Sequence, residues 1–205
     1  MNSRDALSNP LDEHEHQHRS RLLQALARVS VEKGLAAVTI ADIVREAGVS
    51  KRTFYEYFDS KDSCFLALYR AANASALRTL REAVRPDRPW STQVEHALHA
   101  YFTHLSAGPG LIRVLFIDIH HLGQAGISLR REVMQQLADF MVLTVNGGAD
   151  PAPATPVQAL NPALALAAVG AINELVLDAI ERGAAGDLPS LAPHATAVIH
   201  RLARL

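Results

Sequence analysis

Residues 39–62, TIADIVREAGVSKRTFYEYFDSKD, decide the fold of the amino-terminal part of this chain. Apolar residues recur at helical spacing over residues 40–47, which predicts a short amphipathic helix. Thr39 precedes this stripe as a helix cap, and Asp42 stands three residues later in the capping-box position. Gly48 can adopt the left-handed conformation that ends a helix. The first half of the stretch therefore predicts a helix with defined ends.

A second short helix is predicted to begin after Ser50, which can cap it. Phe54 and Phe58 share one face of this helix, as residues four apart do. The other faces carry cations, hydroxyls and phenols, from Lys51, Arg52, Thr53, Tyr55 and Tyr57. An apolar inner face below a polar outer face is typical of a helix that lies in a DNA major groove. The stretch is therefore interpreted as a helix-turn-helix.

The order of these residues resembles the DNA-binding domain of the TetR (tetracycline-repressor-like) family of bacterial regulators. The resemblance covers residues 19–70: a first helix ending at Gly34, then Thr39-Ile40-Ala41-Asp42-Ile43, Ala47-Gly48-Val49-Ser50, Thr53-Phe54-Tyr55-Glu56-Tyr57-Phe58 and Lys61-Asp62. It implies an all-α fold with about nine helices, a helix-turn-helix domain, and a second helical domain for effector binding and dimerisation. It also implies a DNA interface made by Thr39, Ser50, Lys51, Arg52, Thr53, Tyr55, Tyr57 and Lys61.

Within that interface, the resemblance implies different roles for different residues. Thr39 and Lys61 match positions that contact backbone phosphates, and Tyr55 and Tyr57 match positions against the backbone and the groove floor. Lys51, Arg52 and Thr53 match positions nearest the base edges, where Arg or Lys reads guanine. Arg52 departs from the small residues common at its position, so the choice between Lys51 and Arg52 as the base reader stays open.

Composition bounds the class of protein. The chain has 205 residues, of which 49% are hydrophobic and 20% charged, so a substantial core can form. The formal net charge is −1, but residues 19–70 hold nine Lys or Arg against six Asp or Glu. Any DNA affinity is therefore expected to be local to this segment. A single Cys64, a polar N-terminus and no apolar run long enough for a membrane span favour a cytoplasmic protein.

No stretch alternates with period two over the length of a strand, so the chain is predicted to be all-α. A flexible arm is expected over residues 1–18, a helix-turn-helix domain over 19–65, and an effector and dimerisation domain over 66–205. Helices are expected over residues 19–33, 61–83, 92–106, 111–119, 128–145, 162–182 and 190–204, in addition to the two already described, with a loop over 146–161.

Two apolar sets in the second domain carry the remaining predictions. The first set lies in the helices of residues 92–145, where the resemblance implies a cavity for small molecules; its expected lining is Leu98, Phe102, Phe116, Ile119, Leu137, Phe140 and Met141, with His99, His120 and Asp118 as polar groups. The second set lies on the last two helices, which the resemblance implies pair with their symmetry mates. The expected dimer contacts are Ala167, Gly170, Ala171, Val198 and Leu202.

Ten histidines raise a metal hypothesis. His14, His16 and His18 alternate in the expected arm, and a second group comprises His96, His99, His104, His120 and His121. Their spacing matches no tight metal-binding motif, so no metal or other cofactor is expected. The sequence also lacks paired carboxylates, a nucleophile elbow and a Gly-rich phosphate loop, so no enzyme is expected.

The sequence as a whole predicts a homodimeric DNA-binding regulator. The favoured reading is a repressor that leaves a palindromic operator when an apolar effector binds. The alternatives are a His-rich metal-binding protein, either a metal-responsive regulator or a helical metalloenzyme, and an architectural DNA-binding protein without an effector.

Overall fold

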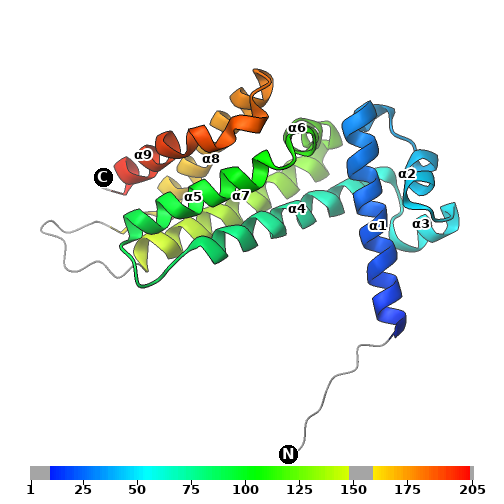
Figure 1. Cartoon of the computed structure of the whole chain (residues 1–205), viewed down its shortest axis with the longest axis horizontal. Coiled ribbons are helices and arrows are strands. Elements are labelled where there is room, and N and C mark those ends of the chain that lie inside the picture. Colours follow the sequence, from blue (N-terminus) through cyan, green and yellow to red (C-terminus); the bar gives the residue numbers. More distant parts are fainter. Residues whose placement is uncertain (1–9, 148–158, 204–205) are drawn as a thin grey trace, which may run out of the picture. The chain divides into compact units, whose positions relative to one another are not determined.

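The computed structural model describes residues 10–147 and 159–203. All regular secondary structure in these residues is helical (Figure 1). The α-helices are α1 (Pro10–Lys33), α2 (Ile40–Ala47), α3 (Lys51–Tyr57), α4 (Lys61–Ala83), α5 (Trp90–Ser106), α6 (Pro109–Asp118), α7 (Gly123–Asn146), α8 (Pro162–Glu181) and α9 (Ala192–Leu202). Three 3-10 helices accompany them: η1 (Leu35–Ala37), η2 (Ile119–Leu122) and η3 (Ala185–Leu191). The all-α prediction is confirmed.

The chain divides into two units, Met1–Leu68 and Tyr69–Leu205, and the boundary falls inside α4. In the first unit α1 packs against α2, η1 and α3. Its core contains Leu26, Ile43, Phe54 and Phe65, all of which are fully buried. Burial of aromatic and branched side chains from α1 to α4 holds the short α2 and α3 in place, since helices of their length are marginal on their own.

The first helix begins earlier than the sequence analysis predicts. The expected arm extended to residue 18, whereas α1 begins at Pro10. Proline suits the first turn of a helix because its φ is already helical and its missing N–H is not needed there. The sequence did not indicate this extension, because no apolar stripe at helical spacing precedes residue 19. Residues 1–9 of the expected arm lie outside the described residues.

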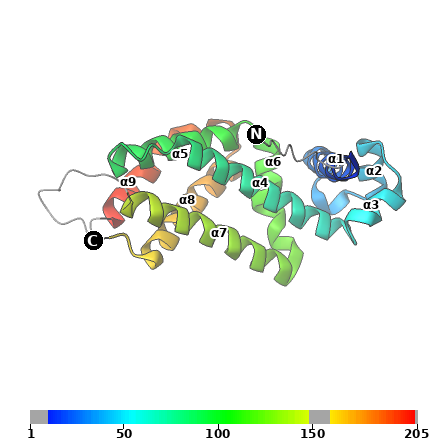
Figure 2. The same cartoon turned by 90° about the horizontal axis from the view of Figure 1, so that it is seen from below.

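In the second unit four helices close a ring: α7 packs against α8, α8 against α9, α9 against α5, and α5 against α7 (Figures 1 and 2). The short α6 packs against α5 and α8. The residues most deeply buried in this unit include Phe102 of α5, Val176 of α8 and Ile199 of α9. The core of the unit therefore lies inside the ring.

Four helix starts in this unit differ from the prediction. α5 begins at Trp90 rather than residue 92, and α6 begins at Pro109 rather than residue 111. α7 begins at Gly123 rather than near residue 128. Gly126 lies within its first turn, and a Cβ there would collide with the carbonyl oxygen of Ile119, so glycine permits this close packing. The last helix begins at Ala192 rather than near residue 190, since the preceding residues form η3.

α8 begins as predicted, with the side chain of Asn161 accepting a hydrogen bond from the amide of Ala163 at 2.8 Å and Pro162 at the first helical position. By length and composition alone α8 could cross a membrane, but such helices also occur in the cores of soluble proteins. Only 39% of its apolar window is buried within the chain. The helix therefore has apolar surface that is exposed in a single copy. Residues 148–158 of the loop expected over residues 146–161 lie outside the described residues.

Candidate nucleic-acid interface and ligand cavity

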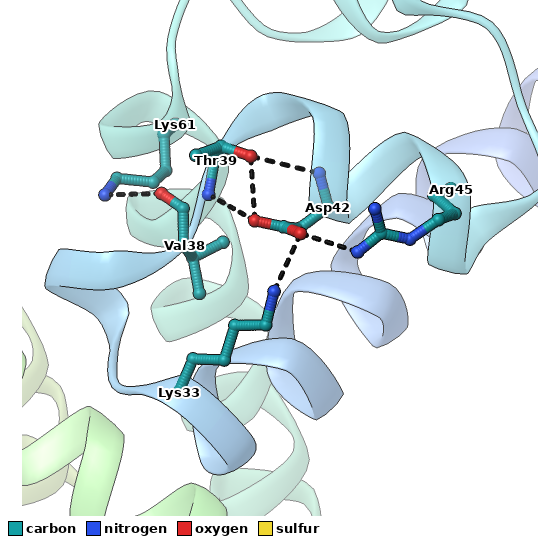
Figure 3. Close-up of polar contacts among 6 residues, drawn as sticks. All are labelled: Lys33, Val38, Thr39, Asp42, Arg45 and Lys61. Atoms are coloured by element: carbon teal, nitrogen blue, oxygen red, sulfur yellow. Dashed lines mark hydrogen bonds and ion pairs between the residues drawn. The ribbon is translucent and has the colours of Figure 1, made fainter.

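The N-terminus of α2 is fixed by a reciprocal capping box between Thr39 and Asp42 (Figure 3). The hydroxyl of Thr39 accepts a hydrogen bond from the amide of Asp42 at 3.2 Å, and the Asp42 carboxylate accepts one from the amide of Thr39 at 3.1 Å. The same carboxylate accepts the Thr39 hydroxyl proton at 2.7 Å. The predicted capping box is confirmed, and it orients Thr39 at an exposed helix N-terminus.

The Asp42 carboxylate is buried between two cations. Its Oδ1 lies 2.8 Å from Nζ of Lys33 at the end of α1 and 2.6 Å from a guanidinium nitrogen of Arg45 (Figure 3). The hydrogen bond from Lys33, followed by those from Thr39 and Arg45, holds the pKa of Asp42 well below its usual range. Asp42 thus ties the start of α2 to the end of α1.

The low pKa of Asp42 predicts a loss of stability in acid. The folded chain keeps Asp42 ionised at a pH where the unfolded chain protonates it. Its contribution is therefore complete above the unfolded pKa, near 3.8, and is lost as the pH falls towards the lower folded pKa. We expect Asp42→Asn to have a lower melting temperature than the parent chain at pH 6, and this gap to narrow between pH 5 and pH 3. A gap that stays constant with pH would contradict the assignment.

Lys61 has a different position from the one expected of a phosphate contact. Its Nζ donates to the carbonyl oxygen of Val38 at 2.9 Å (Figure 3). It also donates to that of Leu35 at 2.7 Å and lies 3.4 Å from that of Ala36. Two of these carbonyls belong to η1 and one to the residue that follows it, and the Leu35 oxygen also accepts the amide of Val38. An ammonium group with three donors suits such a cluster of acceptors at a helix end. Lys61 therefore anchors the turn before Thr39. Sequence spacing could not show this, because the partners are more than 20 residues apart.

We expect Lys61→Met to lower the free energy of unfolding by about 1.5–3 kcal/mol, the range for hydrogen bonds to a charged group. Chemical denaturation would measure this change. The slope of log K against log salt for DNA binding should stay within error of the parent value. A slope flattened by about one unit with unchanged stability would instead restore Lys61 as a phosphate contact.

The turn between α2 and α3 depends on Gly48 and on a residue that the sequence analysis missed. Gly48 has φ 62° and ψ 40°, the left-handed conformation expected of it. Arg21 of α1 donates to the carbonyl oxygens of Ala47 at 2.5 Å and Gly48 at 3.3 Å. Arg28 of the same helix lies 3.0 Å from Glu46. Two arginines spaced seven residues apart on α1 therefore hold the end of α2, and that spacing was the available signal.

α3 presents the outer face that the sequence predicts. Ser50 caps it by accepting a hydrogen bond from the amide of Thr53 at 3.0 Å, and the two hydroxyls lie 3.0 Å apart. Phe54 and Phe58 are buried, with their ring centroids 5.8 Å apart. Lys51 and Arg52 are exposed, as is Tyr55 with 56% of its surface accessible, while Thr53 and Tyr57 are half-buried. The side of α3 away from the core is therefore polar and basic.

Arg52 makes only a weak contact in the free chain. Its Nε lies 3.4 Å from the carboxylate of Glu56, one turn along, and the Arg52 side chain is 91% exposed. Exposed pairs of this kind contribute little stability, so Arg52 can exchange Glu56 for another partner at small cost. Thr39, Lys51 and Arg52 all remain available to DNA.

The second unit contains a main cavity of about 370 Å³. Its lining comes from α4, α5, α6, α7 and α8 and includes Ala76, Leu105, Leu115, Phe116 and Leu137. A smaller inner cavity of about 60 Å³ lies beside it, lined by residues that include Leu98, Phe140, Met141 and Ile199. Leu137, Tyr101 and Asn173 line both. Both cavities lie wholly within the second unit.

The structure distributes the expected lining residues unevenly. Leu98, Leu137, Phe140 and Met141 line the inner cavity, and Phe116 and Leu137 line the main one. Phe102 lines neither, because it is fully buried in the core beside Tyr101. Ile119 lies at two smaller pockets next to the main cavity.

The polar groups of the cavities also differ from those expected. His99 and His120 are exposed and line neither cavity, and Asp118 pairs with His121 at 3.4 Å. The main cavity instead contains Tyr69, Asn73, His104 and Asn173, which sequence phase alone did not indicate. Burial raises the pKa of the tyrosines at positions 69 and 101, so both stay neutral hydrogen-bonding groups.

One stripe of α8 runs through Ala163, Ala167, Ala171, Glu174 and Asp178, and it is exposed except at Ala171, which is half-buried. Two of the expected dimer contacts, Ala167 and Ala171, are on it. Gly170 is on the side facing α7, since a Cβ at Gly170 would lie 3.9 Å from Cε of Met134. On α9, Val198 and Leu202 are half-buried and one turn apart, so they share a face.

Within residues 17–147 and 159–203 the histidines do not gather into a metal-binding group. Among the residues that the structure describes, no three His, Cys, Asp or Glu side chains converge as metal ligands. His96, His99, His120 and His121 are exposed, and His104 lines the main cavity. The side chains of His14 and His16 lie outside the described part. Cys64 is buried, and burial raises the pKa of its thiol to about 12, which disfavours the reactive thiolate.

The capped helix pair with a basic outer face defines the first unit as a helix-turn-helix DNA-binding domain. Residues 22–68 match the family described as "Bacterial regulatory proteins, tetR family". Over these residues the predicted resemblance to the TetR family of bacterial transcriptional regulators is confirmed.

Curated relatives match only part of their length. The chain is 32% identical over 84 residues to the nucleoid occlusion factor SlmA of Mannheimia succiniciproducens, which covers 41% of this chain and 39% of the relative. It is 33% identical over 75 residues to the uncharacterised HTH-type regulator YvdT of Bacillus subtilis, covering 37% of this chain and 39% of the relative. It is 28% identical over 100 residues to the transcriptional activator FasR of Mycolicibacterium smegmatis, covering 49% and 46%. The matches therefore span less than half of each relative.

Solved structures share the fold over most of the chain. The fatty acid degradation regulator FadR of Bacillus halodurans gives a TM-score of 0.71 at 16% identity, covering 88% of this chain and 93% of the other. FadR of Bacillus subtilis in complex with stearoyl-CoA gives a TM-score of 0.68 at 16% identity, covering 88% and 96%. At such identities the likeness establishes the fold.

Proposed function

We propose that this chain is a homodimeric repressor of the bacterial cytoplasm that binds a palindromic operator and leaves it when a largely apolar effector binds. The observation that carries the proposal is the division of α3 into two faces. Phe54 and Phe58 are buried under it, while Lys51 and Arg52 are exposed on its outer side. A short, capped helix of this kind can enter a major groove with its cationic side chains directed towards the DNA.

The residues of this interface take separate roles in the proposal. Lys51, Arg52 and Thr53 lie on the first turn of α3, which in helix-turn-helix complexes reaches base edges, and Arg or Lys can donate two hydrogen bonds to guanine. Thr39 and the tyrosines at 55 and 57 contact the sugar-phosphate backbone. The capping box of Thr39 supports its role, because it holds the amides of an exposed helix N-terminus in one orientation.

Dimerisation follows from the requirement to hold two such helices on one duplex. A two-fold dimer places two α3 helices in successive major grooves, about 34–36 Å apart. The alanine stripe of α8, exposed at Ala163 and Ala167, supports this helix as one half of the contact, since small residues permit close helix approach. Val198 and Leu202 supply the apolar contacts of α9.

The effector site is the main cavity together with the inner cavity. A volume of about 370 Å³ falls within the roughly 300–1,000 Å³ of small-molecule sites, and the mixture of many apolar with few polar groups is typical of them. The stearoyl-CoA complex of FadR from Bacillus subtilis supports an acyl-type ligand for this fold. A ligand that binds better to the DNA-free conformation weakens operator binding, and the operator weakens ligand binding by the same factor.

Repression, rather than activation, is itself part of the proposal, because one relative, FasR, is named as a transcriptional activator. The cavity favours a ligand-responsive regulator over an architectural protein. The scattered histidines disfavour the metal-binding alternative for the described residues.

Selection of bound sequences from random duplexes by the full-length chain tests the DNA-binding part of this proposal. We expect an inverted repeat with half-site centres one helical turn apart. Arg52→Ala should lose selectivity at one base pair in each half-site, at a cost of about 1–3 kcal/mol per contact. Glu56→Gln serves as the control, because it removes the partner of Arg52 and leaves the guanidinium in place. Recovery of no enriched sequence would overturn the proposal.

A further inference from the structure

Four hollows of the second unit form a row. A surface pocket of about 220 Å³ between η2, α7 and α8, here the entrance pocket, is lined by residues that include His120, Arg130 and Arg131. A narrow space of about 20 Å³, here the neck, shares Ile119, His120 and Arg130 with it. The neck shares Tyr69, Phe116 and Asn173 with the main cavity, which in turn adjoins the inner cavity. Each hollow therefore shares lining residues with the next, from the entrance pocket at the surface to the inner cavity in the core.

The row changes character from one end to the other. The entrance pocket is lined by two arginines and a histidine, and no acidic residue lines it. Glu174 lines the neck, together with His120 and Arg130. The inner cavity is apolar apart from Tyr101, Thr144 and Asn173. One end of the row is cationic and the other is apolar.

The guanidinium groups of Arg130 and Arg131 have no acidic partner among the residues that the structure describes. Neither forms an ion pair or a side-chain hydrogen bond there, although the arginines at 28, 45, 52, 88 and 182 all do. Arg130 also lies close to Tyr69, which lines the main cavity. Burial raises the pKa of Tyr69, and the charge of Arg130 offsets part of that rise. Arg130 therefore faces both the entrance pocket and the cavity side of the neck.

The entrance pocket has an apolar side as well. Ile127 is 47% exposed and Leu166 is 36% exposed, and both line it. Along α7 the lining residues run from Arg130 through Leu137 and Met141 to Thr144, a rise of about 21 Å at 1.5 Å per residue. The row is thus long in one direction, which favours a linear ligand over a compact one.

We propose that this row binds a linear amphiphile, with its alkyl chain in the main and inner cavities and an anionic head group, carboxylate or phosphate, at Arg130 and Arg131. Guanidinium groups bind both anions through paired hydrogen bonds, and burial of the chain supplies the remaining affinity. This inference rests on the proposed function and specifies its effector class.

Calorimetric titration with three ligands of equal chain length tests the assignment. Dodecanoate and dodecyl phosphate carry the two candidate head groups, and 1-dodecanol carries the chain without a charge. The two anions are used below their critical micelle concentrations and the alcohol below its solubility limit. We expect at least one anionic ligand to bind 10-fold or more tightly than 1-dodecanol, and the stronger of the two identifies the head group. The combined change Arg130→Gln and Arg131→Gln should reduce its affinity to that of 1-dodecanol and leave 1-dodecanol unaffected.

Arg113→Gln is the matched control, since Arg113 is exposed on α6 and lines none of the four hollows. This variant should bind the anionic ligands like the parent chain. Equal binding of charged and uncharged ligands, or full affinity in the doubly substituted chain, would overturn the head-group assignment and leave the apolar cavity standing. Failure of all three ligands to bind would overturn the cavity as an effector site as well.

Discussion

Val198→Glu is expected to convert the chain to a monomer and to lower its operator affinity by about 10²- to 10⁴-fold, the gain that a second linked contact provides. Val198 is half-buried on α9 in one copy, and in the proposed dimer the new carboxylate would be buried without a cation. Because the dimer is two-fold symmetric, each dimer would bury two such carboxylates, and the free-energy penalty would apply twice. Sedimentation velocity and fluorescence anisotropy with a labelled operator would measure the two effects.

Thr103→Glu provides the control for charge, because Thr103 is exposed on α5, away from the proposed contact. It should remain dimeric and bind the operator like the parent chain. A Val198→Glu chain that sediments as a dimer and keeps operator affinity would exclude α9 from the interface.

Leu137→Trp is expected to abolish release of the operator by ligand while leaving the dimer and its DNA affinity within about two-fold. Leu137 lines both the main and the inner cavity, so a larger ring there occupies the space where the two meet. The measurement is anisotropy of labelled operator during titration with whichever of dodecanoate, dodecyl phosphate or 1-dodecanol releases the parent chain.

Leu143→Trp is the control on the same helix, because Leu143 is 73% exposed and lines neither cavity. It should respond to ligand like the parent chain. If Leu137→Trp were released at the same ligand concentration, the cavities would not be the effector site. If Leu137→Trp failed to bind DNA, its thermal melting would be measured. Loss of a cooperative melting transition would show that the larger side chain had disrupted the fold by overpacking.

The helix-turn-helix was predictable because its signals are local. The capping box of Thr39, the left-handed Gly48 and the cap of Ser50 depend on residues three or fewer apart, and all three are present. The contacts of Arg21 and Lys61 were not predictable in the same way. Each joins a side chain to backbone carbonyls more than 20 residues away, and any exposed cation in the sequence fits such a role equally well.

The cavity lining was only partly predictable for a related reason. Helix periodicity identifies which residues of α5 and α7 are buried, but a buried residue can face a cavity or a neighbouring side chain. Phe102 and Phe140 look alike in the sequence, yet only Phe140 lines a cavity. The same limit applies to Gly170, whose small size serves packing against Met134 within the chain.

The most direct test of the central claim is a footprint and mass measurement on a duplex that carries the selected site. We expect two chains per duplex and two protected major-groove segments, related by two-fold symmetry and centred one helical turn apart. Lys51→Ala combined with Arg52→Ala should remove both segments together. One chain per duplex, or protection without two-fold symmetry, would contradict the account.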